Sequence, residues 1–144
     1  LQQELAPWYS FNTSAAIYKN KINAFTITNR YPVPTVYNMA EESITSGNFK
    51  LNNMFKLKGQ AQIQLSGVYL AKDIIPQGTI GSRFSVDMGI KKQIQKGKGE
   101  LFLNGADVLG SLRTERSIIG NGFTYNSIDY PETQVFRLGY SYKF

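Results

Sequence analysis

Apolar residues alternate with polar residues or glycine over the last nine positions of the chain, after Val135. One set is apolar and mostly aromatic, namely Phe136, Leu138, Tyr140, Tyr142 and Phe144, and the other is Val135, Arg137, Gly139, Ser141 and Lys143. Because side chains along a strand point to opposite faces in turn, the pattern predicts a strand over 133–144 with an unbroken apolar stripe. A chain terminus is usually frayed and polar unless something ties it down. A terminal strand that ends on an aromatic residue therefore indicates closure of a barrel, with lipid as the solvent of the stripe.

The same alternation recurs upstream, broken by turns that contain glycine, and no helical period of 3.6 stands out. Strands are predicted at 83–93, 60–71 and 46–58, with a further strand that starts near 100. A first strand begins at 8, and its continuation past a bend toward 28 is left open. The sequence thus predicts an all-β chain of about six antiparallel strands.

The connections between these strands alternate in length. Those at 58–59 and 95–99 are short, whereas 31–43, 73–81 and 110–132 are long and rich in Pro, Gly, Asn and Asp. Outer-membrane barrels have short periplasmic turns and longer extracellular loops. The last strand would then run toward the periplasm, which places both short turns on that side. The loop pattern favours an up-and-down transmembrane β-barrel.

The polar faces of the strands separate a membrane barrel from a soluble β-sandwich. They carry mostly Ser, Asn, Gln and Gly with scattered lysines, which suits the wall of a polar lumen. The water-facing side of a soluble sandwich is usually dense in Lys and Glu. A soluble β-sandwich or lipid-binding barrel stays open as the lesser alternative.

Six strands fall short of the minimum of about eight for a closed membrane barrel. An open edge in lipid would leave backbone donors and acceptors unsatisfied, at several kcal/mol each. We therefore expect residues 1–144 to be the C-terminal part of a larger barrel, or one piece that another chain completes. The start at Leu1, without Met or a leader, suggests a processed product or a fragment.

Composition narrows the chemistry. The 144 residues include nine Tyr, nine Phe and thirteen Gly but no Cys or His, and no stretch approaches the length of a transmembrane helix. The formal net charge of +6 includes lysines at 91, 92, 96 and 98, around a tight turn. Since the aromatics fall on the opposite face, nucleic acid is not expected as a partner. Solvated turn lysines near anionic head groups are the simpler interpretation.

No motif for catalysis, a cofactor or a metal is apparent. Glu41 with Glu42, and Asp129 with Glu132, are close acidic groups without the geometry of a glycosidase pair or the spacing of a calcium loop. Residues 120–122 form a turn and lack the Gly-Lys-Ser/Thr ending of a phosphate loop. Neither Gly-x-Ser-x-Gly nor Ser-x-x-Lys occurs. The chain is predicted not to be an enzyme.

Two sets of residues have candidate roles in a membrane barrel. Trp8, Tyr9 and Tyr140, with Tyr142 and Phe144 beside them, would form an aromatic girdle at the periplasmic interface; the alternative is core packing in a soluble sandwich. Basic residues predicted to face the lumen are Lys50, Lys56, Arg137 and Lys143. These cations could pair with plug carboxylates or line the path of an acidic solute, although simple solvation is the more frequent role.

Several segments resemble the C-terminal end of TonB-dependent receptors, in order and spacing from Trp8 to Phe144. The matching stretches are Ser66-Gly67-Val68-Tyr69 with Pro76-Gln77-Gly78, then Val86 to Lys92, then Leu101 to Leu109. The closing Arg137-x-Gly139-x-x-Tyr142-x-Phe144 resembles the β-signal that the barrel-assembly machinery reads. The usual Asp-Phe-Asn or Asp-Ile-Phe ending of the penultimate strand is Asp107-Val108-Leu109 here.

The resemblance implies the last six strands of a 22-stranded barrel in the outer membrane of a Gram-negative bacterium. The parent would take up a nutrient, with outer-membrane lipid, the rest of the barrel and the assembly machinery as partners. TonB and a surface lipoprotein would act through the parent. The plug domain of the family is absent from these residues, so gated transport cannot be argued from them. A barrel with a structural, adhesive or secretory role is the alternative.

Overall fold

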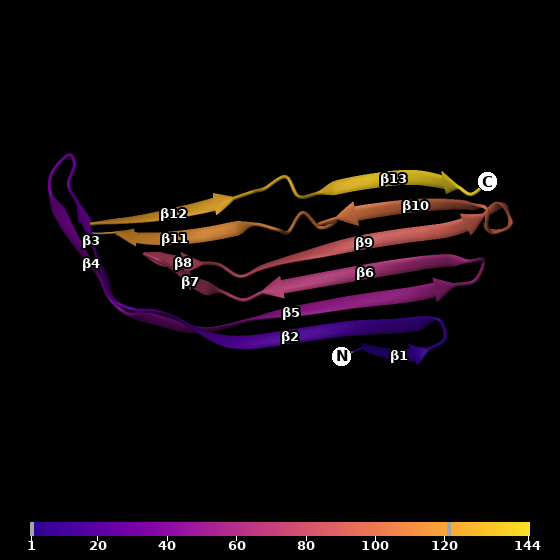
Figure 1. The fold of residues 1–144 in the computed structure, drawn as a ribbon, viewed down its shortest axis with the longest axis horizontal. Helices are drawn as coiled ribbons and strands as arrows, with labels where there is room; N and C mark the ends of the chain where they lie inside the picture. The colour runs from indigo at the N-terminus through magenta and orange to yellow at the C-terminus, as the bar shows by residue number, and fades with distance from the viewer. Residues whose placement is uncertain (1, 121) are drawn as a thin grey trace.

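The computed structural model describes residues 2–120 and 122–144, which form an all-β, antiparallel chain. Seven strands make one large sheet in the order β1-β2-β5-β6-β9-β10-β13 (Figure 1). Their bounds are β1 Gln2–Ala6, β2 Tyr9–Ile22, β5 Glu42–Leu57, β6 Ala61–Leu70, β9 Arg83–Ile94, β10 Gly99–Ala106 and β13 Val135–Tyr142. Sequential neighbours pair throughout, so the predicted up-and-down order is confirmed.

The expectation of about six strands is wrong, because the described residues contain thirteen. The six predicted strands correspond to β2, β5, β6, β9, β10 and β13. The short strand β1 pairs with β2 through a two-residue turn at Pro7 and Trp8 and has a bulge between Glu4 and Ala6. Five residues with a bulge carry too little alternation to predict a strand.

The long connections also contain strands. These are β3 Phe25–Asn29, β4 Thr35–Met39, β7 Asp73–Ile75, β8 Gly78–Ile80, β11 Thr114–Gly120 and β12 Phe123–Asp129. The β3–β4 hairpin stands alone, and the other four strands form a second sheet in the order β12-β11-β8-β7. The continuation of the first strand past a bend, which the sequence left open, is present as β3, which follows β2 after two residues and pairs with β4 outside the large sheet. Paired hairpins satisfy their own backbone groups without needing a buried apolar face, so they leave a weak sequence pattern.

The two ends of the large sheet differ. Its three short turns and the C-terminus lie at one end, and the long connections with their hairpins lie at the other (Figure 1). The short turns use left-handed backbone at Gly59 and Gln60, and again over Gln95, Lys96 and Gly97. Such conformations close tight hairpins. We call these two ends the short-turn end and the long-loop end.

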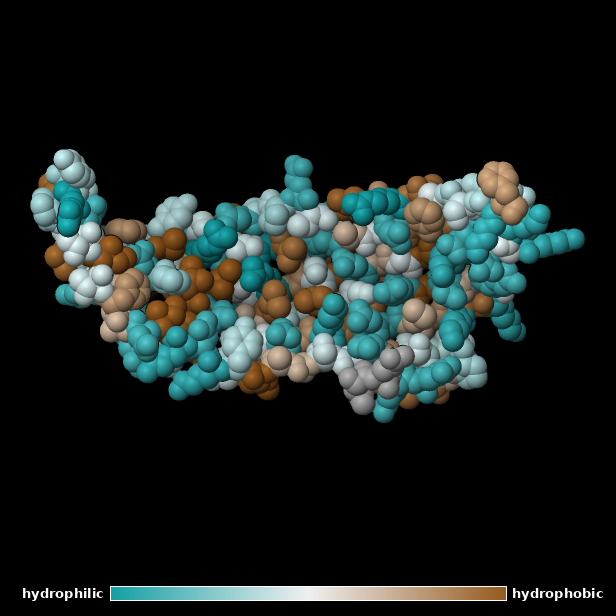
Figure 2. Space-filling view, in the orientation of Figure 1, coloured by the Kyte–Doolittle hydropathy of each residue, from teal (hydrophilic) through white to brown (hydrophobic). Residues whose placement is uncertain are grey.

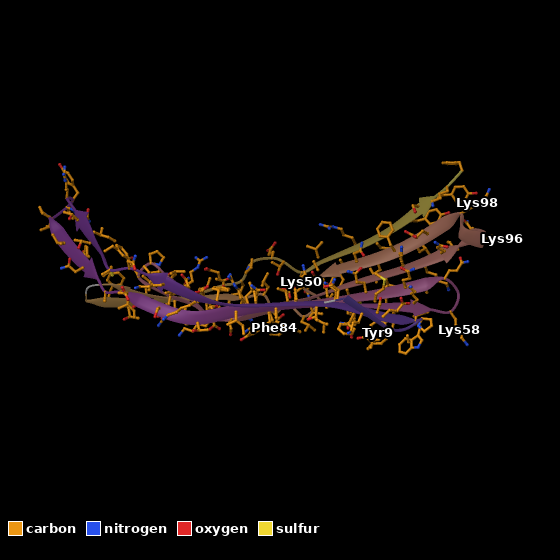
Figure 3. All side chains as sticks on the ribbon, turned by 60° about the horizontal axis from the view of Figure 1, so that its bottom comes forward. Tyr9, Lys50, Lys58, Phe84, Lys96 and Lys98 are labelled. Atoms are coloured by element: carbon orange, nitrogen blue, oxygen red, sulfur yellow. The ribbon has the colours of Figure 1, made fainter. Side chains whose placement is uncertain are left out.

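The large sheet is curved, with faces of opposite character. Figure 3 shows Lys50 on the concave side and Phe84 and Tyr9 on the other side. The pairing register extends this division, because Phe49, Tyr69 and Phe84 lie directly opposite one another on neighbouring strands. Figure 2 views the concave face, which is mostly hydrophilic over the short-turn half and more hydrophobic near β7 and β8.

The chain has almost no core of its own. In the described part of the chain, Ile74 is the only buried hydrophobic residue, at 7 % exposure, whereas Leu138 is 79 % and Phe136 57 % exposed. The large sheet does not close into a barrel, since β1 and β13 are its two open edges. Seven strands span too small an arc to meet. A single layer of this kind needs a separate medium for its apolar convex face.

Candidate functional site

One row of residues crosses the concave face of the large sheet from β2 to β13. The row consists of Ser10, Met54, Gln64, Gly89, Asn104 and Arg137, each opposite the next in register. Apart from Met54, its members are polar or glycine. Six strands of similar phase thus place a polar floor across the concave face, close to the short-turn end on β2 and about midway along β9.

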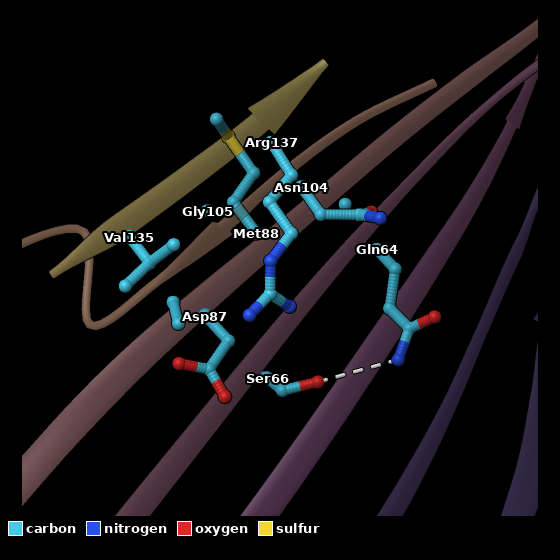
Figure 4. A pocket seen from close by; sticks show the side chains of 10 residues that line it. Gln64, Ser66, Asp87, Met88, Asn104, Gly105, Val135 and Arg137 are labelled. Atoms are coloured by element: carbon cyan, nitrogen blue, oxygen red, sulfur yellow. Dashed lines mark hydrogen bonds between the residues drawn. The ribbon is translucent and has the colours of Figure 1, made fainter. Parts of the chain in front are cut away.

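A hollow of about 290 Å³ lies on this floor around Arg137. Gly89 has no side chain to fill the space beside Asn104, and the Arg137 side chain extends over it from β13 toward Asp87 (Figure 4). Gln64 Nε2 donates to Ser66 Oγ at 3.3 Å along the rim. A guanidinium with amide and hydroxyl groups around it can hold a carboxylate or a hydroxylated solute.

A second hollow, of about 370 Å³, adjoins the first on the short-turn side. It includes Lys91 and Glu100, whose Nζ and Oε2 atoms are 4.0 Å apart in a partly exposed pair. The ring of Phe102 lies over Gly139, and a Cβ at position 139 would collide with that ring. Gly139, predicted from the β-signal resemblance, therefore also has a packing requirement.

Asp107 joins three strands at the long-loop end of β10. Its carboxylate accepts hydrogen bonds from Thr133 Oγ1 at 2.7 Å, Ser111 N at 3.0 Å and Leu112 N at 3.1 Å. Its own backbone N–H donates to Asp87 Oδ1 at 2.8 Å. Burial opposes ionisation of Asp107, but the hydrogen bonds from Thr133, Ser111 and Leu112 outweigh it and lower the pKa.

This role of Asp107 was missed by the sequence analysis, which noted only that its tripeptide departs from the family pattern. The sequence did contain an indication of this role: Asp107 directly follows a predicted strand, and Gly110 and Ser111 come shortly after it. An Asp side chain in such a position can accept hydrogen bonds from the backbone N–H groups that follow it. The network fixes the segment between β10 and β11 to β9 and to Thr133, two residues before β13.

The long-loop end has a second anchored carboxylate, Asp73 on β7. Asn20 Nδ2 donates to its Oδ1 at 3.0 Å and Tyr18 Oη to its Oδ2 at 3.1 Å. The bond from Asn20 lowers the pKa of Asp73 most strongly, and bonds from Ile74 N and Tyr18 add to it against the effect of burial. These contacts hold β7, with buried Ile74, against β2 and β5.

Aromatic rings gather on the convex face at the short-turn end. The Tyr9 ring stacks on Phe55 with centroids 4.9 Å apart, and Trp8 lies 5.7 Å from Tyr9. Tyr140 Oη donates to Gln95 Oε1 at 2.7 Å, which ties β13 to the adjacent turn. The girdle assigned to Trp8, Tyr9 and Tyr140 stays a prediction.

A second aromatic row, which the sequence analysis missed, crosses the same face nearer the long-loop end. It consists of Phe49, Tyr69 and Phe84. Phe49 and Phe55 are six positions apart on β5, which corresponds to about 20 Å of strand. On a strand tilted by about 40° this separation covers about 15 Å of membrane depth, less than the apolar band of about 25 Å, so the two rows do not by themselves mark both boundaries of the hydrocarbon layer.

The predicted cations are divided between two places. Lys50, Lys56 and Arg137 lie on the concave face by register. Lys143 follows β13, and its backbone N–H donates to Lys98 O at 2.8 Å. Their roles toward a lumen, a plug or a solute stay predictions.

Other kinds of site find no support within residues 2–120 and 122–144. No group of three or more His, Cys, Asp or Glu side chains there could hold a metal ion. In the same residues, no helix is long and apolar enough to cross a membrane.

Comparison with known proteins gives one match. The profile of the outer membrane protein β-barrel family matches residues 1–142. No curated protein matches the chain. No solved structure matches it.

Proposed function

The chain belongs to the outer membrane protein β-barrel family. On that premise we propose that it forms part of the wall, the outer loops and the assembly signal of a TonB-dependent transporter for nutrient uptake. The family places the chain in the outer membrane of a Gram-negative bacterium. Transport, energy coupling through TonB and a non-enzymatic role are the proposed parts.

The observation that carries the proposal is the opposite character of the two faces of the large sheet. The convex side presents Leu138, Leu103 and Ile90 in one register row, which suits lipid. The concave side presents the polar row that ends at Arg137, which suits a water-filled passage. The open edges at β1 and β13 call for further strands, from the same parent or another chain.

The orientation follows from the lengths of the connections. We assign the short-turn end to the periplasm and the long-loop end to the cell exterior. In this orientation the Arg137 hollow lies inside the passage, below the hairpins that would meet a solute first. An acidic or hydroxylated nutrient, such as a glycan or a peptide, fits the groups around that hollow.

Uptake in living cells tests the proposal. A strain that lacks the parent gene is complemented with the wild type or with the double variant Tyr142→Asp/Phe144→Asp, and labelled glycans, peptides and ferric siderophores are offered. We expect one class to enter only with the wild type and only while the proton-motive force is intact. Equal entry of every class in the two strains would overturn transport, and entry that survives a protonophore and loss of TonB would overturn the energy coupling.

One observation favours a surface-adhesive role as the second candidate. The β11–β12 hairpin exposes Phe123 at 57 %, Tyr125 at 56 % and Ile128 at 53 %. Exposed aromatic surface at the outer end of a barrel is suited to binding another surface. Cell-to-surface attachment that is lost in Phe123→Ser/Tyr125→Ser, with uptake unchanged, would favour adhesion over transport.

A further inference from the structure

Positive charge is concentrated at the short-turn end of the sheet. The basic residues within about four positions of its turns and of the end of β13 are Lys56, Lys58, Lys91, Lys92, Lys96, Lys98 and Lys143. The carboxylates at this end are Glu4 and Glu100. Nine basic and eight acidic residues make up the rest of the chain, so almost all of the net charge of +6 is at this end. Figure 3 shows Lys58, Lys96 and Lys98 grouped there.

Lys92 occupies an unusual position among these cations, since it lies on the apolar convex face. Its register row reads Tyr140, Leu101, Lys92, Ala61 and Leu57. Lysine tolerates such a row when its methylene stem lies along lipid and its ammonium group reaches the head groups. The row therefore marks the boundary between hydrocarbon and head groups at this end of the sheet.

The turn beside Lys92 is held in a fixed shape. Tyr140 Oη bonds to Gln95 Oε1 at 2.7 Å, and Lys143 N bonds to Lys98 O at 2.8 Å. Gly99 is buried beneath the Tyr140 ring, where a Cβ would come within 3.1 Å of Tyr140 Cε2. Exposed Lys96 and Lys98 are thus presented on a hairpin that is tied to β13 and whose turn begins three positions after Lys92.

We propose that Lys92, Lys96 and Lys98, bounded by the Tyr140 ring, form a binding site for the phosphate group of an anionic phospholipid such as phosphatidylglycerol. The ammonium groups attract the phosphate while the row from Leu57 to Tyr140 contacts the acyl chains. The inference rests on the assignment of the chain as barrel wall and is independent of transport. In the proposed orientation the lipid belongs to the periplasmic leaflet.

Native mass spectrometry of the parent barrel in a neutral detergent tests this site. The barrel is offered phosphatidylglycerol or phosphatidylcholine at equal concentration, and the bound lipid is counted. We compare the wild type with Lys92→Gln/Lys96→Gln/Lys98→Gln and with the matched control Lys19→Gln/Arg30→Gln/Lys72→Gln. The control removes equal charge at exposed positions of the long-loop end.

The wild type should bind more phosphatidylglycerol than phosphatidylcholine. The triple variant Lys92→Gln/Lys96→Gln/Lys98→Gln, which we call the short-turn variant, should bind at least about tenfold less phosphatidylglycerol than the wild type. The control should bind as much as the wild type. A wild type that does not discriminate between the lipids, as expected if an acidic protein is the natural partner, would overturn the proposal. So would equal losses in the two variants, because net charge alone would then explain binding.

A measurement on the wild type covers the case in which the short-turn variant does not assemble. Phosphatidylglycerol with a photoreactive head group should label the peptide that contains 91–99. Label distributed evenly over the barrel would contradict the site. Because lipid retention and solute uptake are read separately, loss of uptake with lipid binding intact affects only the transport proposal.

Discussion

Tyr9 Oη donates a 2.9 Å hydrogen bond to Asn53 Oδ1 across the β2–β5 pair. Asn53 belongs to the apolar convex face, since its register neighbours are Phe11 and Leu65. An amide in contact with lipid is costly unless it is hydrogen-bonded. The tyrosine hydroxyl therefore explains how an Asn is accommodated within the apolar stripe.

Removal of this hydroxyl should destabilise the barrel. Tyr9→Phe leaves the Asn53 amide oxygen without its donor, at an expected cost of about 1–3 kcal/mol in unfolding free energy. Urea unfolding of the parent barrel in lipid vesicles measures it. The double variant Tyr9→Phe/Asn53→Leu removes the unpaired group as well and should recover most of the loss. A double variant no more stable than Tyr9→Phe would show that Asn53 does not face lipid.

Gly139 should be replaceable only if Phe102 is reduced in size. Gly139→Ala places a methyl group against the Phe102 ring, so we expect a smaller fraction of heat-modifiable, assembled barrel on unheated gels. Phe102→Ala should restore assembly to Gly139→Ala if packing is the cause. No recovery in the double variant would assign Gly139 to recognition by the assembly machinery instead.

The terminal aromatics should be required for insertion. Tyr142→Asp/Phe144→Asp places two carboxylates on the apolar stripe and removes the aromatic part of the β-signal resemblance, so the parent should be translated but not inserted. Ser141→Asp, on the opposite face of β13, is the matched control and should insert. Membrane fractions probed by antibody give the readout, and normal insertion of the double variant would exclude the β-signal assignment.

Leu103 tests the phase of the strands. Its register row includes Leu138 and Ile90 on the convex face, one row inside the boundary row of Leu101 and Lys92, so Leu103→Arg should cost about 1–3 kcal/mol, between the values for the interface and for the membrane midplane. Asn52→Arg, on the concave face, should cost less than about 0.5 kcal/mol because lumen positions accept charge. Equal costs for the two variants would mean that the faces are assigned the wrong way round.

The Asp107 network should make stability depend on pH in the acid range. The hydrogen bonds hold the folded pKa of Asp107 below its ordinary value of 3.8, so the ionised carboxylate contributes stability above about pH 4. That contribution disappears as the pH falls through the folded pKa. The stability gap between the wild type and Asp107→Asn should be full at pH 7 and shrink below pH 4 in urea unfolding. A gap that is constant down to pH 2.5 would falsify the linkage.

Sequence periodicity was sufficient for the strands that carry a long apolar stripe. The alternation from Phe136 to Tyr142 could be seen directly, because every second residue on that face must suit one medium. The short strands β7 and β8 could not be predicted in this way. They are placed by contacts such as Asn20 to Asp73, which join positions 53 residues apart.

Register was the other property that the pattern could not supply. Alternation shows which residues share a face of one strand, and it does not show which residue of the next strand lies opposite. The row of Phe49, Tyr69 and Phe84 depends on the turn at Gly59 and Gln60 and on the β7–β8 connection. The Arg137 hollow depends likewise on the register of four strands, β6, β9, β10 and β13, so only Arg137 among its lining residues was a candidate from the sequence.

The attachment of β7 to β2 and β5 has a consequence for how the outer end of the barrel can diversify. Tyr18 and Asn20 hold Asp73, and β7 is joined through β8 to β11 and β12. Replacement of Asn20 would thus shift four strands together, whereas exposed side chains such as Phe123 and Tyr125 can change one at a time on an unchanged framework. New specificities should arise by exchange of side chains at the hairpin tips, and changes at Tyr18, Asn20 and Asp73 should require simultaneous compensation.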